Sequence, residues 1–140
     1  MYTVLRILTA AGGWHHGFHL RIDNPHYMAL VIEATDESGP CGLPALSVCH
    51  YGEQNGDAMR DPEMCFELGL SGGVHLNPYY WRADYVAIEQ WSRFIQGGHY
   101  CFHRQLHAEH ERFAHLWDRN LRQQGFAEAF ARQRQRQPHT

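Results

Sequence analysis

The stretch from His50 to Met64 reads His-Tyr-Gly-Glu-Gln-Asn-Gly-Asp-Ala-Met-Arg-Asp-Pro-Glu-Met, and it decides the fold because it joins two segments of alternating apolar residues. The Asn-Gly dipeptide at positions 55 and 56 is a strong signal for a tight turn between two strands. The flanking segments, residues 46–50 and 64–70, carry apolar side chains at every second position, the period of a strand with one buried face. The stretch therefore predicts a β-hairpin with an exposed tip.

The register of this hairpin follows from its apolar faces. A two-residue Asn-Gly turn alone sets the apolar faces of the two strands out of phase. A shift by one residue pairs Val48 with Met64 and Leu46 with Phe66, which brings the apolar faces together. We therefore predict either a three-residue turn or a β-bulge within the hairpin.

The tip is dense in polar and charged residues. Gly52 and Gly56 are free to adopt a positive φ and are expected to shape the backbone there. Such a tip is either solvated turn chemistry or a binding site, and both interpretations stay open from the residues alone. The candidate contact residues at the tip are Glu53, Gln54, Asn55, Asp57, Arg60 and Asp61.

The same stretch carries a family resemblance. Its motif Tyr-Gly-Glu-Gln-Asn-Gly-Asp, followed by Met-Arg-Asp-Pro-Glu-Met and later by residues 78–90, resembles a family of short uncharacterised bacterial proteins of plasmids, phages and integrated elements. The resemblance covers about residues 45–91. It implies an accessory protein of a mobile genetic element, without an activity or substrate. Inhibition of a host defence component is one role of such small proteins, so the resemblance favours that role by association.

Length and periodicity predict one α+β domain. A chain of 140 residues that is 44% hydrophobic is long enough for one core and short for two. We predict an antiparallel sheet of about four to five strands, with a long helix from residue 101 packed on one face and a short helix at the N-terminus. A strand is predicted over residues 85–94, after a connection over residues 71–78. The predicted buried stripe of the long helix, which also contains Glu109, comprises Phe102, Leu106, Phe113, Leu116 and Trp117.

The C-terminus predicts a different kind of segment. We place the domain at residues 1–131 and a basic, disordered tail at residues 132–140, because the tail alternates Arg with Gln and lacks apolar side chains. All 12 basic residues are arginine, and 6 of them follow residue 111 together with only 2 acids. The tail arginines that could contact phosphates are Arg132, Arg134 and Arg136.

Aromatic residues gather after the hairpin. Tyrosine and tryptophan side chains usually belong to the core of a protein. Beside an acidic tip, however, Tyr79, Tyr80 and Trp81 could also form part of a protein-binding surface. We include them among the candidate partner contacts.

Candidate metal ligands occur on the long helix and around the hairpin, and a structural role is also possible in each place. His103, His107 and His110 share an arc of about 60° on the long helix, which could hold a metal, but histidines are also common at the border of a buried stripe. An oxygen-rich magnesium or manganese site, with His50 as general base, would need the set His50, Glu53, Asp57, Asp61 and Glu63. We expect no bound metal and no cofactor.

Cysteine spacing and the absence of catalytic motifs reduce the number of functions that the sequence supports. The four cysteines, at positions 41, 49, 65 and 101, form no Cys-x-x-Cys pair, so we expect free thiols and a soluble cytoplasmic protein. The usual catalytic and nucleotide-binding motifs are absent from the sequence. We therefore favour a non-catalytic protein-binding accessory protein. A small metal-dependent enzyme acting on nucleic acid or nucleotides is the alternative, and a nucleic-acid accessory factor using the arginine tail is the third hypothesis.

Overall fold

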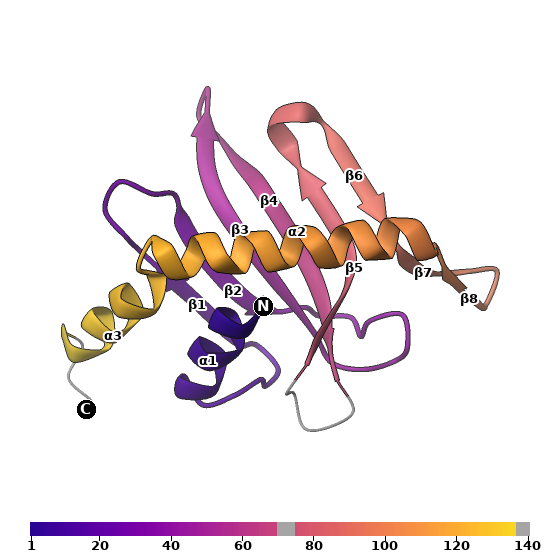
Figure 1. The fold of residues 1–140 in the computed structure, drawn as a ribbon, viewed down its shortest axis with the longest axis horizontal. Coiled ribbons are helices and arrows are strands. Elements are labelled where there is room, and N and C mark those ends of the chain that lie inside the picture. Colours follow the sequence, from indigo (N-terminus) through magenta and orange to yellow (C-terminus); the bar gives the residue numbers. More distant parts are fainter. Residues whose placement is uncertain (70–74, 137–140) are drawn as a thin grey trace.

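The computed structural model, which describes residues 1–69 and 75–136, is an α+β fold built on a six-stranded antiparallel sheet (Figure 1). Its strands lie in space in sequence order, as β1 (His19–Ile22), β2 (Ala29–Ala34), β3 (Ala45–Gln54), β4 (Asp57–Leu68), β5 (Leu76–Ala83) and β6 (Ile88–Trp91). A second, two-stranded sheet pairs β7 (Arg93–Gln96) with β8 (His99–Phe102). The predicted fold class and antiparallel sheet are confirmed, whereas the predicted number of strands was too small. Leu70, the connection at residues 71–73 and the last four residues lie outside the described part of the chain.

The β3–β4 hairpin has the predicted register. Leu46 pairs with Phe66 and Val48 pairs with Met64, and all four side chains are buried. The turn itself has two residues, Asn55 and Gly56, and both have a positive φ, as a type I′ turn requires. The phase is corrected further down the hairpin, by a bulge.

This bulge lies in β4. Between the pairs Cys49–Glu63 and Tyr51–Arg60, β3 advances by two residues and β4 by three. In the bulge Asp61 and Pro62 lie opposite the single residue His50. Proline is tolerated there because residues in a bulge do not donate a regular interstrand hydrogen bond, so the absence of a proline N–H costs nothing. Gly52, which we expected to adopt a positive φ, lies in the extended strand instead.

Three helices cover one face of the main sheet (Figure 1). They are α1 (Tyr2–Ala10), the long α2 (Arg104–Gln123), which crosses the strands, and α3 (Phe126–Arg136). Their apolar faces join Leu46, Val48 and Phe66 in one core, so the alternating side chains of the hairpin are buried beneath the helical layer. The predicted short N-terminal helix and the predicted long helix are confirmed, and α3 begins at Phe126, directly after the helix stop expected at Gly125.

The buried side of α2 is rotated relative to the predicted stripe. Phe102 belongs to β8 and Leu116 is exposed, so these two residues were wrongly assigned to the buried stripe. Glu109 is exposed and interrupts the predicted stripe. Burying polar residues is possible here because tertiary partners satisfy them: the carboxylate of Asp118 accepts a 2.7 Å hydrogen bond from the free N–H of Thr3 in the first turn of α1. The side chains that α2 buries are His110, Ala114, Trp117, Asp118 and Leu121.

The segment after the hairpin differs most from prediction. Residues 77 and 78, predicted as part of a connection, lie within β5. The strand predicted over residues 85–94 is instead the 3₁₀ helix η1 (Asp84–Val86), then β6, then β7. Ala87 has a φ of 53°, and this left-handed conformation turns the chain back to form β6. The single predicted strand was therefore wrong.

The C-terminal helix extends into the predicted tail. α3 continues to Arg136, so residues 132–136 are helical rather than disordered. The side chains of Phe126 and Phe130, in the first turns of α3, are buried in the core. The side chain of Gln133 donates a 2.8 Å hydrogen bond to the carbonyl of Arg21 in β1. Contacts with distant residues thus support a segment that has little apolar content of its own.

No helix in the described ranges has the length and apolar character that crossing a membrane requires.

Candidate functional site

The hairpin tip projects beyond the helical layer, at the end of the sheet away from the loop that joins β2 to β3 (Figure 1). Glu53, Gln54, Asn55 and Asp57 are all exposed there, as the binding hypothesis requires. Neither carboxylate of this tip forms an ion pair with any described residue. The tip therefore carries uncompensated negative charge.

Apolar side chains flank the tip on both sides, and the sequence interpretation missed them. Met28 precedes β2 and Tyr85 lies in η1, yet they approach the same glycine: a Cβ on Gly52 would lie 2.9 Å from the Met28 sulfur and 2.7 Å from the Tyr85 hydroxyl. Tyr27 and Tyr85 are 47% and 42% exposed, so their rings remain available at the surface. The bare glycine lets the two flanks meet across the hairpin. Only the pairing of β2, β3 and η1 brings these residues together, and no local sequence pattern signals it.

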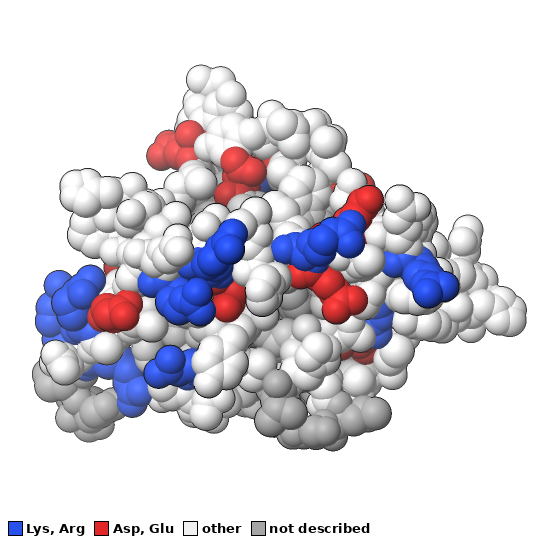
Figure 2. Space-filling model, viewed as in Figure 1, with Lys and Arg blue, Asp and Glu red and all other residues white. Residues whose placement is uncertain are grey.

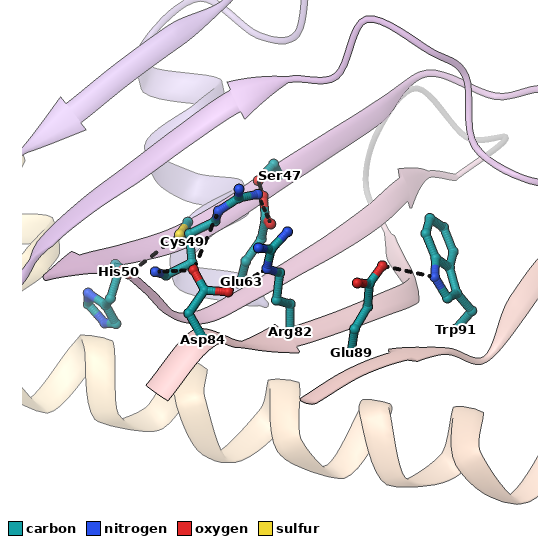
Figure 3. A network of polar contacts seen from close by, with 9 residues as sticks. Ser47, Cys49, His50, Glu63, Arg82, Asp84, Glu89 and Trp91 are labelled. Carbon is teal, nitrogen blue, oxygen red and sulfur yellow. Dashed lines mark hydrogen bonds and ion pairs between the residues drawn. The ribbon is translucent and has the colours of Figure 1, made fainter. Parts of the chain in front are cut away.

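A polar network fixes the base of the hairpin on the sheet face opposite the helices (Figure 3). The hydroxyl of Ser47 donates a 2.6 Å hydrogen bond to Glu63, whose other carboxylate oxygen accepts one from Arg60 at 3.1 Å. Asp84 in turn accepts the backbone N–H of Arg60 at 2.8 Å and Nε–H of Arg82 at 2.5 Å. Arg60, which we placed among the tip contacts, belongs instead to this network, which ties β3, β4 and β5 to η1.

The ionisation of Asp84 shows how strongly the network favours charge. Burial alone would raise the pKa of this carboxyl, but the hydrogen bonds from Arg60 and Arg82 outweigh burial and hold the pKa below its ordinary value. Glu63 is only 7% exposed and has both oxygens engaged. The network consequently anchors the hairpin and leaves no carboxylate free for a ligand.

The aromatic run does not form one exposed surface. Tyr79 and Tyr80 are 7% and 6% exposed and pack with Ala45 on the sheet face away from the helices. Trp81 is half-buried on the other face, edge-on to Phe113 of α2 at 5.7 Å between ring centroids. Tyr79 and Tyr80 share a face although they are consecutive, because β5 has a bulge between the pairs Phe66–Pro78 and Cys65–Tyr80. Trp81 points to the opposite face, so the three rings do not form the single surface that was predicted.

A second exposed region lies at the other end of the sheet, and among its residues only Tyr79 was a predicted partner contact. A groove of about 920 Å³ runs between residues 35–40 and the side chains of Tyr79, Trp91, Phe94 and Ile95. Trp91 is 47% exposed and Ile95 is 54% exposed. Apolar side chains of this size at the surface are a recognisable feature of interaction sites.

The three helix histidines have separate structural partners. His103 caps the N-terminus of α2, where its Nδ1 accepts the N–H of Leu106 at 3.2 Å. His107 lies 2.8 Å from the side-chain oxygen of Asn77 and 3.0 Å from Glu111. His110 is 2% exposed, and its Nδ1 lies 2.8 Å from the hydroxyl of Ser92. Burial, reinforced by the neighbouring histidines, lowers the pKa of His110 to about 4, so its ring is neutral at pH 7.

The proposed oxygen-rich metal site is not assembled. His50 packs on the helix side against Trp117 and Phe126, with ring centroids 5.5 Å away in each case, while Glu63 points to the opposite face. Glu53 and Asp57 stand apart from both, at the tip. Within residues 1–69 and 75–136, no group of three or more His, Cys, Asp or Glu side chains is arranged to hold a metal ion.

The four cysteines are free thiols, as predicted. Cys49 is fully buried, and burial together with the charge of Glu63 raises the pKa of its thiol. The same two effects raise the pKa of Cys65 to about 12. Neither thiol is therefore activated as a nucleophile.

The helical layer is basic, whereas the rest of the chain is acidic. The three helices hold eight arginines and four acids, so the remaining segments hold four arginines and eleven acids. Figure 2 shows the basic side chains spread over this face. The exposed outer face of α2 presents Arg104, Arg112, Arg119 and Arg122, and α3 adds the tail arginines Arg132, Arg134 and Arg136.

Comparison with known proteins gives a family but no activity. No curated protein and no solved structure matches the chain. Residues 2–127, nearly the whole of the folded region, match the family described as a domain of unknown function, DUF6908. The chain therefore belongs to the DUF6908 family.

Proposed function

We propose that this protein is a non-catalytic binding module whose projecting β3–β4 hairpin engages a partner protein. The observation that carries the proposal is the composition of this end of the sheet. Two tip carboxylates have no ion-pair partner in the part of the chain that the structure describes, and exposed Tyr27, Met28 and Tyr85 flank them. Aromatic residues and methionine are enriched in protein interfaces, and charge at the rim adds specificity and speeds association. The partner surface that fits would present arginine or lysine side chains to the tip and apolar side chains to its flanks.

The lower part of the hairpin supports this role by holding the tip in place. The Ser47–Glu63–Arg60–Asp84 network and the buried pairs of β3 and β4 fix its strands, while Tyr85 packs over Gly52. A preorganised surface loses less conformational entropy on binding than a mobile loop does. Among the described residues, the Cys49 thiol is buried, His103, His107 and His110 have structural partners, and the carboxylates are dispersed, so these groups form no comparable arrangement for catalysis.

The biological setting that we propose is a mobile genetic element, with a host defence component as the partner to be inhibited. This part of the proposal is supported only by the resemblance of residues 45–91 to proteins of plasmids, phages and integrated elements. The binding role can be tested separately from this setting.

Charge reversal at the tip is expected to abolish partner binding without unfolding the protein. In the variant Glu53→Arg/Asp57→Arg, both substitutions are exposed, so stability should change by about 0.5 kcal/mol per site or less. Binding should weaken by several kcal/mol, because attraction to a basic surface becomes like-charge opposition. The partner is isolated by affinity capture from the natural host, identified and purified, and its affinity is then measured by calorimetry.

The matched control is Glu109→Arg/Glu128→Arg, which makes the same change in net charge on the helical layer. It should bind like the wild type. A tip variant that also binds like the wild type would show that the hairpin is only a solvated turn. The variant Tyr85→Ala then tests the apolar flank on its own, and it should weaken binding mainly through faster dissociation.

A second candidate function is nucleic-acid binding, favoured by the basic helical layer. Its arginines have no ion-pair partners among the described residues, and they occur on α2 and α3 rather than on the tail alone. Contacts of this kind would be sequence-independent and sensitive to salt.

Truncation after Ala131 separates the roles of this segment. Three exposed hydrogen bonds are lost, while Phe126 and Phe130 remain. Gln133 donates to the Arg21 carbonyl and accepts the N–H of Asp23 at 3.5 Å, and Arg134 donates to the Ala10 carbonyl. We expect a loss of about 1 kcal/mol, visible as a small drop in the thermal midpoint. If the helical layer binds DNA, removing three arginines should also lower the slope of log affinity against log salt by about 3. An unchanged slope would exclude these arginines as phosphate contacts.

A further inference from the structure

The groove between β6, β7 and the β2–β3 loop has the shape and chemistry of a second binding site, separate from the hairpin tip. It lies at the start of β3 and the tip at the end of β3, and these are ten residues or roughly 30 Å apart along the strand. Its volume is about 920 Å³. That is enough to hold several residues of an extended peptide.

One wall of the groove is a held aromatic surface. The Trp91 ring packs on Tyr80 at 4.4 Å between centroids, and its indole N–H donates to Glu89 at 3.3 Å (Figure 3). Tyr79 lies beside it at 6.3 Å with an angle of 31° between the ring planes. The indole is therefore oriented before any ligand arrives, although 47% of the residue is exposed.

The opposite wall carries negative charge and is also fixed. Asp36 and Glu37 are exposed on the loop, and no described basic residue pairs with either. The loop is anchored from below by Glu67, whose carboxylate accepts the N–H groups of Cys41 at 2.8 Å and Leu43 at 3.2 Å. Gly39 packs so closely on Glu67 that a Cβ at this position would overlap the Glu67 side chain. The wall is thus preorganised as well.

No cation within the described structure neutralises this wall. Arg93, which follows β6 closely in sequence, is buried against Glu67 and also donates to the hydroxyl of Tyr100. An unoccupied aromatic face beside free carboxylates attracts a cation, and a side chain with an apolar stem also satisfies the apolar part of the groove. Arginine fits best, because its planar guanidinium can stack on an indole and donate to carboxylates at the same time.

We propose that this groove binds an arginine-bearing peptide segment of a partner protein, with a guanidinium stacked on Trp91 and paired with Asp36 and Glu37. The inference is independent of the role assigned to the hairpin tip. It predicts two recognition sites at opposite ends of the same sheet, both selective for positive charge and distinguishable by mutation.

The test uses the full chain and a fluorescein-labelled peptide, Gly-Arg-Gly-Gly-Arg-Gly, with a second peptide in which citrulline replaces both arginines. Citrulline keeps the shape of arginine and removes its charge. By fluorescence anisotropy, the arginine peptide should bind about tenfold or more tightly than the citrulline peptide, and added salt should reduce the difference. The indole N–H signal of Trp91 should shift in NMR spectra when the arginine peptide is added.

Three variants locate the site. Trp91→Ala and Asp36→Asn/Glu37→Gln should each weaken binding of the arginine peptide by about tenfold. The matched control, Glu109→Gln/Glu128→Gln, removes the same charge from the helical layer and should leave peptide binding unchanged. Melting curves confirm that each variant is folded. If Trp91→Ala is destabilised, Asp36→Asn/Glu37→Gln still tests the groove, because its substitutions are at exposed residues.

Several results would overturn the proposal. Equal affinity for both peptides would show that charge is not recognised, and wild-type affinity in both groove variants would place the peptide elsewhere. Loss of affinity in a tip variant, Glu53→Gln/Asp57→Asn, with wild-type affinity in both groove variants, would transfer arginine recognition to the hairpin and leave the proposed function intact. Self-association that disappears in the groove variants would identify the occupant as the arginine tail of a second copy rather than a partner protein.

Discussion

Replacing Arg93 by methionine is expected to destabilise the protein by about 3–5 kcal/mol, which is a large part of the total stability of a domain of this size. The side chains of Arg93 and Glu67 are 3% and 1% exposed and form an ion pair, so the substitution leaves a carboxylate buried without its counter-charge. The guanidinium also donates to the hydroxyl of Tyr100 in β8 at 2.9 Å, while its ion pair with Glu67 joins β7 to β4 of the main sheet. Urea unfolding followed by circular dichroism measures the loss.

A second substitution distinguishes charge from packing. In Arg93→Met/Glu67→Gln the remaining amide is neutral, and its oxygen can still accept from the N–H groups of Cys41 and Leu43. The double variant should therefore be more stable than Arg93→Met by about 1–3 kcal/mol. Two results would contradict this role of the buried pair in joining the loop, the main sheet and the β7–β8 hairpin. One is a free energy of unfolding for Arg93→Met within about 1 kcal/mol of the wild-type value. The other is a double variant that is no more stable than Arg93→Met.

Mild acid is expected to destabilise the protein well before the carboxylates titrate. Burial lowers the pKa of His50, His107 and His110 in the folded protein, and that of His110 falls from the model-compound value of 6.5 to about 4. The unfolded chain therefore binds more protons than the folded chain between these two values. Stability is fully present above pH 6.5 and decreases as the pH falls toward 4, with a slope of up to about 1.4 kcal/mol per pH unit for each such histidine. For His110 alone the loss amounts to about 3 kcal/mol.

The variant His110→Gln tests the source of this slope. It removes the titrating ring and keeps a polar side chain beside Ser92. Its free energy of unfolding, measured in urea from pH 7 to pH 4.5, should depend less on pH than that of the wild type. His115→Gln is the control, because His115 lies exposed on the same helix. Asp84 contributes only at lower pH, since its folded pKa lies below 3.8. An equal slope in His110→Gln would assign the acid sensitivity to other groups.

Local pattern determined the part of the fold in which neighbouring residues decide the outcome. Alternation in residues 46–50 and 64–70 predicted the strands and the burial of Val48, Met64 and Phe66, and the need for a bulge followed from parity alone. The Asn-Gly turn and the long helix could also be predicted, because turn type and the 3.6-residue period of a helix depend on residues close in sequence. The exposed carboxylates of the tip could also be located in this way.

Tertiary structure alone decided the features that depend on partners far away in the chain. The bulge settled at Asp61–Pro62 in β4, and the four-residue strands β6, β7 and β8 are too short to show a period. His110 and Asp118 are buried on α2 because Ser92 and the N–H of Thr3 meet them there, which rotates the helix away from its predicted stripe. Tyr85 reaches the hairpin and Trp91 faces the β2–β3 loop only after the sheet has formed. The local sequence sets the conformational preference of each segment, but contacts with distant residues decide which side chains are buried. This is because a buried polar group is stable only where another group forms a hydrogen bond or ion pair with it.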